Sequence, residues 1–326
     1  MTLAHRMGQS ANCVSRFAAG LLAALAALAA SAALAAAPGV AHAEQAPPAA
    51  AAASIPRAEG AGPPLWVVRD ADSTVYLFGT VHVLRPGTAW GSDKVDAAFA
   101  SASDIWVEIA DQDDQAVVMP VIQQHGVDPS RPLSSVLSAA EFAAFDKVAQ
   151  ANGASGAALD AYRPWLAAFM ISMSGPTNAG YRSEAGVDKT LMDRARAQGK
   201  ALHGFETADI QVRLIAGMSE EAQVAYLNNY VRNADGIVAN LDEAVAAWLK
   251  GDAAETGRLN RVNTRDIHED IHRAALVVRN ADWTNQIETM MQGSGTAFIA
   301  VGAAHLMDQD SVIDMLRAKG FAVERL

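Results

Sequence analysis

The chain has 326 residues, a formal net charge of −11 and one cysteine, Cys13. One cysteine near the N-terminus excludes a disulfide framework, a multi-thiolate metal site and a cysteine nucleophile in the mature domain. The acidic balance argues against nucleic acid and anionic membrane as partners, because both bind clustered Lys and Arg. Loss of a leader with two arginines and no acidic residue would make the charge −13.

The first 43 residues have the composition of a secretory signal peptide. A basic start with Arg6 and Arg16 precedes an apolar run at residues 17–37, and a small-x-small motif ends at Ala43. We therefore expect cleavage there and a periplasmic or secreted protein. Retention of the Ala-rich run as an anchor is the alternative, and no later segment has the length and apolarity of a membrane span.

Residues 44–64 are rich in Ala, Pro and Gly and predict a flexible linker. Residues 65–326 then form one large α/β domain. Apolar runs at 65–68 and 74–79 flank a polar turn and predict a β-hairpin. A helix is expected over 93–102, and a largely helical insertion over about 117–249, in which Ser138 and Ser219 are N-cap candidates. Further strands are expected at 105–109, 201–205, 296–301 and 322–326.

One unit occurs twice, a strand followed by Gly-x-x-His. The first runs from Val75 through Gly79 to His82, and the second from Ala297 through Gly302 to His305. Each precedes a helical segment and another strand, so we expect a central mixed β-sheet built from two half-units. Ligands of open α/β sheets bind beyond the carboxyl ends of strands, which would bring the two histidines together. Neutral imidazole is a metal ligand and a general base, whereas the alternative is a loop hydrogen bond for each histidine.

Three further positions are candidates for chemistry. Glu108 ends an apolar strand, where a carboxylate is either exposed at an edge or buried with a partner. Glu206 is in a similar position, with a helix-start charge as the alternative. Arg279-Asn280 follows an apolar helical run, where the guanidinium could stabilise an oxyanion or simply lie at a solvated helix end.

The segment His268-Glu269-Asp270-Ile271-His272 matches the helical zinc motif of metalloproteases. The charged residues around it indicate a solvated helix face instead. A zinc protease that uses His268, Glu269 and His272 is kept as a second alternative.

Several short motifs occur in a fixed order along the chain: Leu65-Trp66, Tyr76 to His82, Val107-Glu108, Gly186-Val187-Asp188, Gly204 to Thr207, Arg279-Asn280 and Phe298 to Leu306. From Leu65 to the C-terminus this ordered set resembles the TraB/GumN family, which belongs to the same superfamily as the animal Tiki proteins. The resemblance implies a fold like that of erythromycin-esterase and ChaN-like proteins. It also implies a divalent metal ion, manganese or cobalt in preference to zinc, held by His82, His305 and Glu108, with Glu206, Arg279 and Asn280 in support.

These observations predict an exported metal-dependent hydrolase, with peptides as the expected substrates and a small molecule as the alternative. The metal would lower the pKa of a bound water and polarise the scissile carbonyl. Glu108 would be a ligand or the base, and Arg279 would stabilise developing charge. A protein that binds a peptide in the same place without cleaving it is the first alternative.

Overall fold

The computed structural model describes residues 55–326, so the expected signal peptide and residues 44–54 lie outside the described residues. Residues 55–64 depart from the linker prediction and pack on the domain. The N–H of Ala58 donates to the carbonyl of Gly91 over 2.9 Å, and Arg57 pairs with Asp96. The partly buried Ile55 packs against the hydrophobic core. The linker prediction rested on the overall composition of residues 44–64, which does not reveal this single apolar contact.

The centre of the fold is a six-stranded mixed sheet with the order β4-β3-β5-β2-β1-β6. Strands β2, β5, β3 and β4 are parallel to one another, whereas β1 is antiparallel to both β2 and β6. The mixed α/β prediction is confirmed, and the closer likeness to erythromycin-esterase and ChaN-like folds stays a prediction. The strands are β1 (Leu65–Arg69), β2 (Ser73–Thr80), β3 (Asp104–Val107), β4 (Ala201–Gly204), β5 (Gly295–Gly302) and β6 (Val323–Arg325).

Local sequence explains the start of the sheet. Asp70 accepts hydrogen bonds from the backbone N–H groups of Asp72 and Ser73, which closes the turn between β1 and β2. The apolar residues on both sides then pair in register, with Leu65 opposite Phe78. The predicted hairpin is therefore confirmed.

Helices cover the sheet on both faces and extend beyond it. Ser138 caps α5 through a capping box with Glu141, and Ser219 caps α10, as predicted. The helices are α2 (Asp93–Ser101), α3 (Gln115–Gly126), α4 (Leu133–Val136), α5 (Ala139–Ala151), α6 (Gly156–Leu159), α7 (Pro164–Asn178), α8 (Val187–Ala197), α9 (Ala208–Ala216), α10 (Glu220–Arg232), α11 (Ile237–Leu249), α12 (Ala253–Val262), α13 (Glu269–His272), α14 (Val278–Met290) and α15 (Val312–Ala318).

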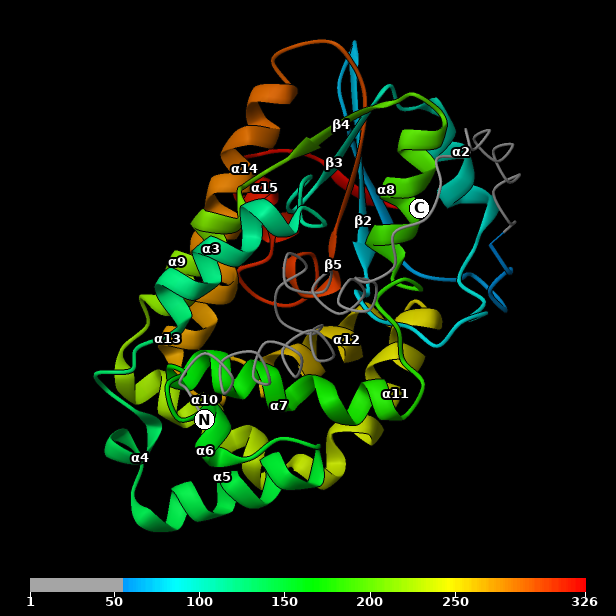
Figure 1. Cartoon of the computed structure of the whole chain (residues 1–326). Coiled ribbons are helices and arrows are strands. Elements are labelled where there is room, and N and C mark those ends of the chain that lie inside the picture. The colour runs from blue at the N-terminus through cyan, green and yellow to red at the C-terminus, as the bar shows by residue number, and fades with distance from the viewer. Residues whose placement is uncertain (1–54) are drawn as a thin grey trace, which may run out of the picture.

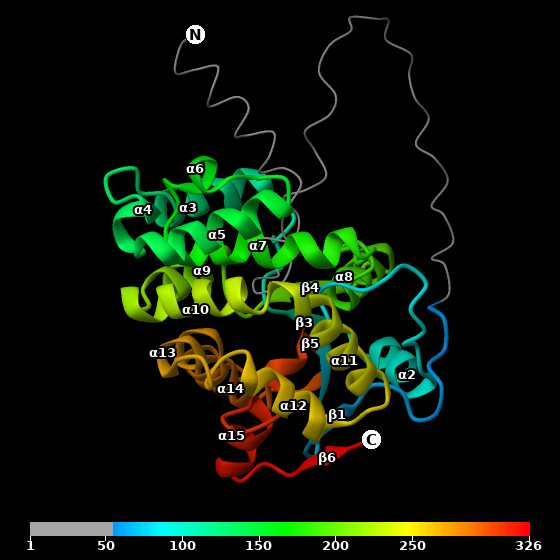
Figure 2. The same cartoon turned by 90° about the horizontal axis from the view of Figure 1, so that it is seen from below.

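Figure 1 shows the sheet nearly edge-on, with α14 and α15 on one side and α2 and α8 on the other. Helices α7, α10, α11 and α12 form a further layer, which Figure 2 shows from below. This layer lies beyond the carboxyl ends of the parallel strands, and the indole N–H of Trp248 in α11 donates to the carbonyl of Gly79 over 2.8 Å. Helix α11 therefore packs against the end of β2 at the carboxyl edge of the sheet.

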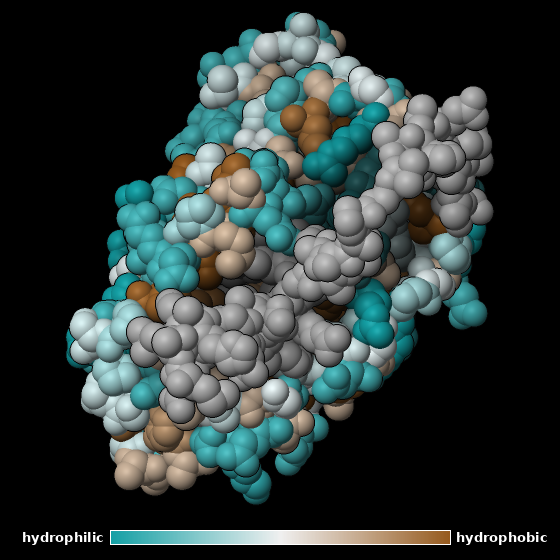
Figure 3. Space-filling model, viewed as in Figure 1, coloured by the Kyte–Doolittle hydropathy of each residue, from teal (hydrophilic) through white to brown (hydrophobic). Residues whose placement is uncertain are grey.

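The strand predicted at 201–205 is confirmed as β4, which lies within the largely helical stretch and joins the sheet beside β3. The predicted helical insertion at 117–249 differs from the structure at its end, because helices continue as far as Met290. No helix within residues 55–326 has the length and apolarity needed to cross a membrane. On the face drawn in Figure 3 hydrophilic residues predominate and hydrophobic ones are scattered, as the acidic composition suggests.

The two half-units are alike only as far as their histidines. Strands β2 and β5 pair in parallel, with Gly79 opposite Val301. The strands that follow them differ, because β3 pairs with β5 in the centre whereas β6 pairs with β1 at the far edge. After β5 the chain forms a 3-10 helix, η4 (Ala303–His305), while after β2 it stays outside regular structure at His82.

Candidate functional site

Each of the four parallel strands is followed within three residues by a predicted site residue. His82 follows β2, Glu108 follows β3, Glu206 follows β4 and His305 follows β5. Because parallel strands end at the same edge of a sheet, these side chains converge. The Nε2 atoms of His82 and His305 both lie 3.8 Å from Oε1 of Glu108. The two histidines, which are 223 positions apart in the chain, therefore face one carboxylate.

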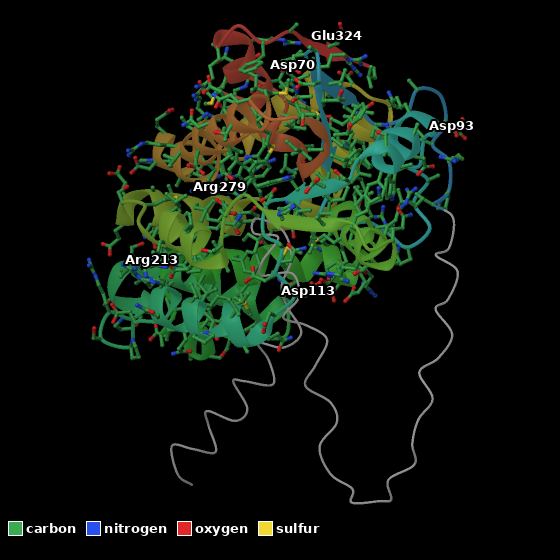
Figure 4. All side chains as sticks on the ribbon, turned by 90° about the horizontal axis from the view of Figure 1, so that it is seen from above. Asp70, Asp93, Asp113, Arg213, Arg279 and Glu324 are labelled. Carbon is green, nitrogen blue, oxygen red and sulfur yellow. The ribbon has the colours of Figure 1, made fainter. Side chains whose placement is uncertain are left out.

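Arg279, in the first turn of α14, joins the two glutamates. Its Nη2 donates to Oε2 of Glu108 over 2.7 Å, and its Nε donates to Oε1 of Glu206 over 2.8 Å. Its side chain is only 3% exposed, and Figure 4 shows it inside the fold while Arg213 lies at the periphery. A charge buried to this degree needs such partners, so the solvated helix end is not what the structure shows.

The pKa values of the two carboxyls that contact Arg279 are shifted in opposite directions. Burial alone would raise the pKa of Glu108, but Arg279 and the two histidines, with the Gly302 N–H, hold that pKa far below its usual range. Burial raises the pKa of Glu206 despite Arg279. Gln211, fully buried on α9, was not predicted as a site residue; its amide donates to Glu206 over 3.1 Å and to Glu108 over 3.4 Å. Glu108 therefore holds its negative charge more firmly than Glu206 does.

His305 is held as a neutral ring. Arginine can only donate, so Nη1 of Arg279 donates to Nε2 of His305 over 3.1 Å. The proton of His305 is therefore on Nδ1, which donates to Oδ1 of Asn280 over 2.6 Å. Burial, reinforced by Arg279, lowers the pKa of His305 to about 3. The ring of Trp283 packs against the imidazole with centroids 4.3 Å apart.

His82 has the opposite character. Its Nδ1 lies 3.1 Å from Oδ1 of Asp188 on α8, and its side chain is 19% exposed, compared with 5% for Glu108 and His305. Burial alone would lower the pKa of His82, but Asp188 and Glu108 outweigh it and raise the pKa to about 9. Asp188, in the first turn of α8, is thus the partner that orients this imidazole. At neutral pH His82 is therefore a cation beside the Glu108 anion.

Two glycines make this packing possible. A Cβ on Gly302 would lie 3.0 Å from Oε1 of Glu108 and 3.1 Å from Nε2 of His82. The N–H of Gly302 donates to the same Oε1 over 2.8 Å. A Cβ on Gly186 would lie 2.2 Å from the carbonyl oxygen of His82, so only glycine lets α8 bring Asp188 to the site.

The charge on His82 predicts a stability that depends on pH. Its folded pKa of about 9 lies above the unfolded value of 6.5, so its contribution is complete below pH 6.5 and is lost as the pH rises through 9. The free energy of unfolding of the wild type should be higher than that of His82→Gln, and this difference should be about 2 kcal/mol larger at pH 6 than at pH 9.5. The figure is reduced to allow for the partial exposure of the ring. Urea unfolding of both proteins at the two pH values measures this, and an equal difference at both would contradict the ion pair.

The expected metal ligands do not fit a three-ligand site in this arrangement. Nε2 of His305 already accepts the Arg279 hydrogen bond, so its lone pair is occupied and a cation faces it. Within residues 55–326 no group of three or more His, Cys, Asp or Glu side chains has a metal-binding arrangement. Glu108 meets a similar obstacle, because its Oε2 accepts from Arg279 and its Oε1 accepts from the Gly302 N–H, so a metal ion would have to displace one of these donors. The contact of His82 with Asp188 is made through Nδ1, which leaves Nε2 as the ring nitrogen that a metal ion would meet.

The structure contradicts the zinc-protease alternative at residues 268–272. His268 has extended backbone angles as the N-cap of the four-residue helix α13, and its Nδ1 accepts from the N–H of Asp270. His272 is buried, and its Nε2 lies 3.3 Å from Asp310. The two rings do not share one helix face, as the zinc motif requires.

Comparisons with known proteins agree with the motifs. An uncharacterized protein of Treponema pallidum is 21% identical over 267 residues, which cover 78% of this chain and 80% of that protein. The uncharacterized protein YbaP of Escherichia coli is 22% identical over 170 residues, or 52% of this chain and 62% of YbaP, so the match spans less than two thirds of that relative. No solved structure matches. The TraB/PrgY/gumN family model matches residues 64–325, almost all of the described domain, and the chain belongs to that family.

Proposed function

We propose that the protein is a hydrolase that cleaves peptide bonds at the carboxyl edge of its sheet. The observation that supports this best is the pair of His82 and Glu108, a protonated imidazole and an ionised carboxylate 3.8 Å apart. Environments that push the pKa values of neighbouring groups apart are typical of acid and base partners. His82 is also the most exposed of the converging side chains, so a substrate reaches it first.

The charges assign a role to each group. As the water oxygen bonds to the carbonyl carbon, Glu108 accepts a proton from that water. As the C–N bond then breaks, His82 donates its Nε2 proton to the leaving nitrogen. The low pKa of Glu108 favours passing its proton back to His82, which restores the starting state. Asp188 keeps the His82 ring oriented by its contact with Nδ1. Arg279 holds Glu108 and adds positive charge behind the reacting carbonyl.

A metal-dependent reaction at the same edge is the alternative proposal. A manganese or cobalt ion would supply a Lewis acid for the carbonyl and a more acidic water. His82 and Glu108 would hold it, and His305 would join them only after Arg279 releases Nε2. Export to the periplasm or the medium, from the signal-peptide prediction, is part of the same proposal and fits peptide substrates outside the cytoplasm.

The test is cleavage of a mixed-sequence peptide library by the purified protein, read by mass spectrometry. We expect products from the wild type and a loss of at least about 100-fold in His82→Gln, since general acid catalysis contributes that much. His203→Gln is the matched control, because His203 lies on the edge strand β4, away from the site, and pairs there with Asp104 of β3. This variant should cleave the library like the wild type. Peptide binding without turnover in the wild type would contradict the hydrolase proposal and indicate a sequestering protein.

Chelation separates the two versions of the reaction. Without a metal, cleavage should persist in EDTA and should not increase when Mn²⁺ or Co²⁺ is added. The metal content of the wild type and of the His82→Ala, His305→Ala double variant is measured in parallel by mass spectrometry. This comparison shows whether any bound metal depends on the two histidines. Cleavage that stops in EDTA and returns with Mn²⁺ would establish the metal-dependent alternative.

A further inference from the structure

The loop that follows His305 has an unusual backbone. Asp308 and Asp310 have φ angles of 85° and 59°, and they are the only non-glycine residues with positive φ within residues 55–326. Side chains disfavour this left-handed region, although aspartate tolerates it better than most. Contacts from elsewhere must therefore hold the loop in this shape.

For Asp310 those contacts come from the segment that resembles a zinc motif. Oδ2 of Asp310 accepts from Nη2 of Arg265 over 2.6 Å and lies 3.3 Å from Nε2 of the buried His272. Nδ1 of His272 lies in turn 3.5 Å from Oγ1 of Thr264. The second histidine of that motif thus has a partner in the loop after His305.

The main chain of Asp310 contacts the site itself. Its carbonyl oxygen accepts from Nδ2 of Asn280 over 2.7 Å, which leaves Oδ1 of Asn280 to accept from Nδ1 of His305. Rotation of the amide would set its oxygen against the Asp310 carbonyl and its N–H groups against Nδ1–H. The Asp310 carbonyl therefore decides which end of the buried amide faces the imidazole.

We propose that Asp310 is a positioning residue of the site, which fixes the tautomer and ring orientation of His305 through Asn280. Arg265 and His272 hold its carboxylate, its carbonyl orients the amide, and the amide keeps the His305 proton on Nδ1. Nε2 then remains an acceptor for Arg279, the residue that holds Glu108. The effect on catalysis rests on the proposed hydrolase, whereas the effect on the tautomer does not.

The test is imidazole NMR of ¹⁵N-histidine-labelled protein, with the His305 signals assigned by their loss in His305→Gln. The wild type should show His305 as the Nδ1–H tautomer. Asp310→Gly permits the φ angle but removes both side-chain anchors, so the Asn280 amide can turn its NH2 group toward Nδ1 of His305. Both ring nitrogens would then face donors, and a fraction of His305 should change to Nε2–H although Arg279 still faces Nε2. Under the proposed hydrolysis kcat should fall on the order of ten-fold with KM nearly unchanged, since the change concerns orientation. Asp310→Asn, which keeps an acceptor oxygen and tolerates the same φ, should restore both.

Asp308→Gly is the matched control. Asp308 also has a positive φ in the same loop, but its carboxylate pairs with Arg261, and the carbonyl that accepts from Asn280 is that of Asp310. This variant should keep the wild-type tautomer. An unchanged tautomer in Asp310→Gly, or an equal change in both glycine variants, would overturn the proposal. If the wild type cleaves no peptide, the proposed function fails while the NMR result still decides the role of Asp310.

Discussion

Replacing Arg279 with methionine is expected to destabilise the folded protein by about 3–5 kcal/mol, the usual effect of removing one partner from a buried ion pair. Methionine fills much of the space, but it leaves Glu108 and Glu206 buried without their shared cation. In the variant, burial without a cation would raise the pKa values of the two carboxyls in the folded state above their unfolded values. The stability of the variant would then fall as the pH rises. Urea unfolding at pH 5 and pH 8 should show a larger deficit at pH 8.

Two variants define the specificity of this result. Arg279→Lys keeps the charge, but one ammonium cannot repeat the two separate contacts, so we expect an intermediate loss. Arg213→Met removes an arginine whose ion pair with Asp209 is exposed, and it should cost less than about 1 kcal/mol. A loss in Arg279→Met no larger than that in Arg213→Met would show that the buried network does not stabilise the fold.

The sequence predicts the parts of this fold that local patterns determine. The β1–β2 hairpin follows from apolar runs around a turn with Asp70, and the start of α5 follows from the spacing of Ser138 and Glu141. The pairing of β6 with β1 does not follow from either run. It depends on contacts between the two ends of the domain, and a strand pattern carries no information about its neighbour.

The candidate site shows the same division. A histidine, a glutamate and a glycine placed at strand ends identify His82, Glu108 and His305, because parallel strands bring their ends together. The partners are different, since Asp188, Gln211 and Asp310 occupy helices and a loop whose packing no spacing reveals. Arg279 also donates to the Nε2 lone pair of His305, a contact that bears on metal binding. This contact likewise depends on the tertiary structure and cannot be predicted from the sequence.

Glu108→Gln is expected to lower kcat by about 10³-fold, within the range for loss of a general base. The amide cannot accept a proton from water, and the change leaves Asp188 as the one remaining anion of the two that raise the pKa of His82. Its NH2 group must also face a donor, either Arg279 or the Gly302 N–H, so some loss of stability, about 1–3 kcal/mol, should accompany the kinetic effect. Peptide cleavage with the library products, at a temperature where the variant remains folded, measures the change.

Glu206→Gln is the matched comparison for Glu108. Both carboxyls are buried against Arg279, and Gln211 contacts both, but only Glu108 lies beside His82. Glu206 acts on the reaction through the guanidinium alone, so its amide should reduce kcat by less than about ten-fold, as expected for a group that only orients another. Equal losses in the two variants would mean that the glutamates work as one unit around Arg279, and the assignment of the base to Glu108 would then be wrong.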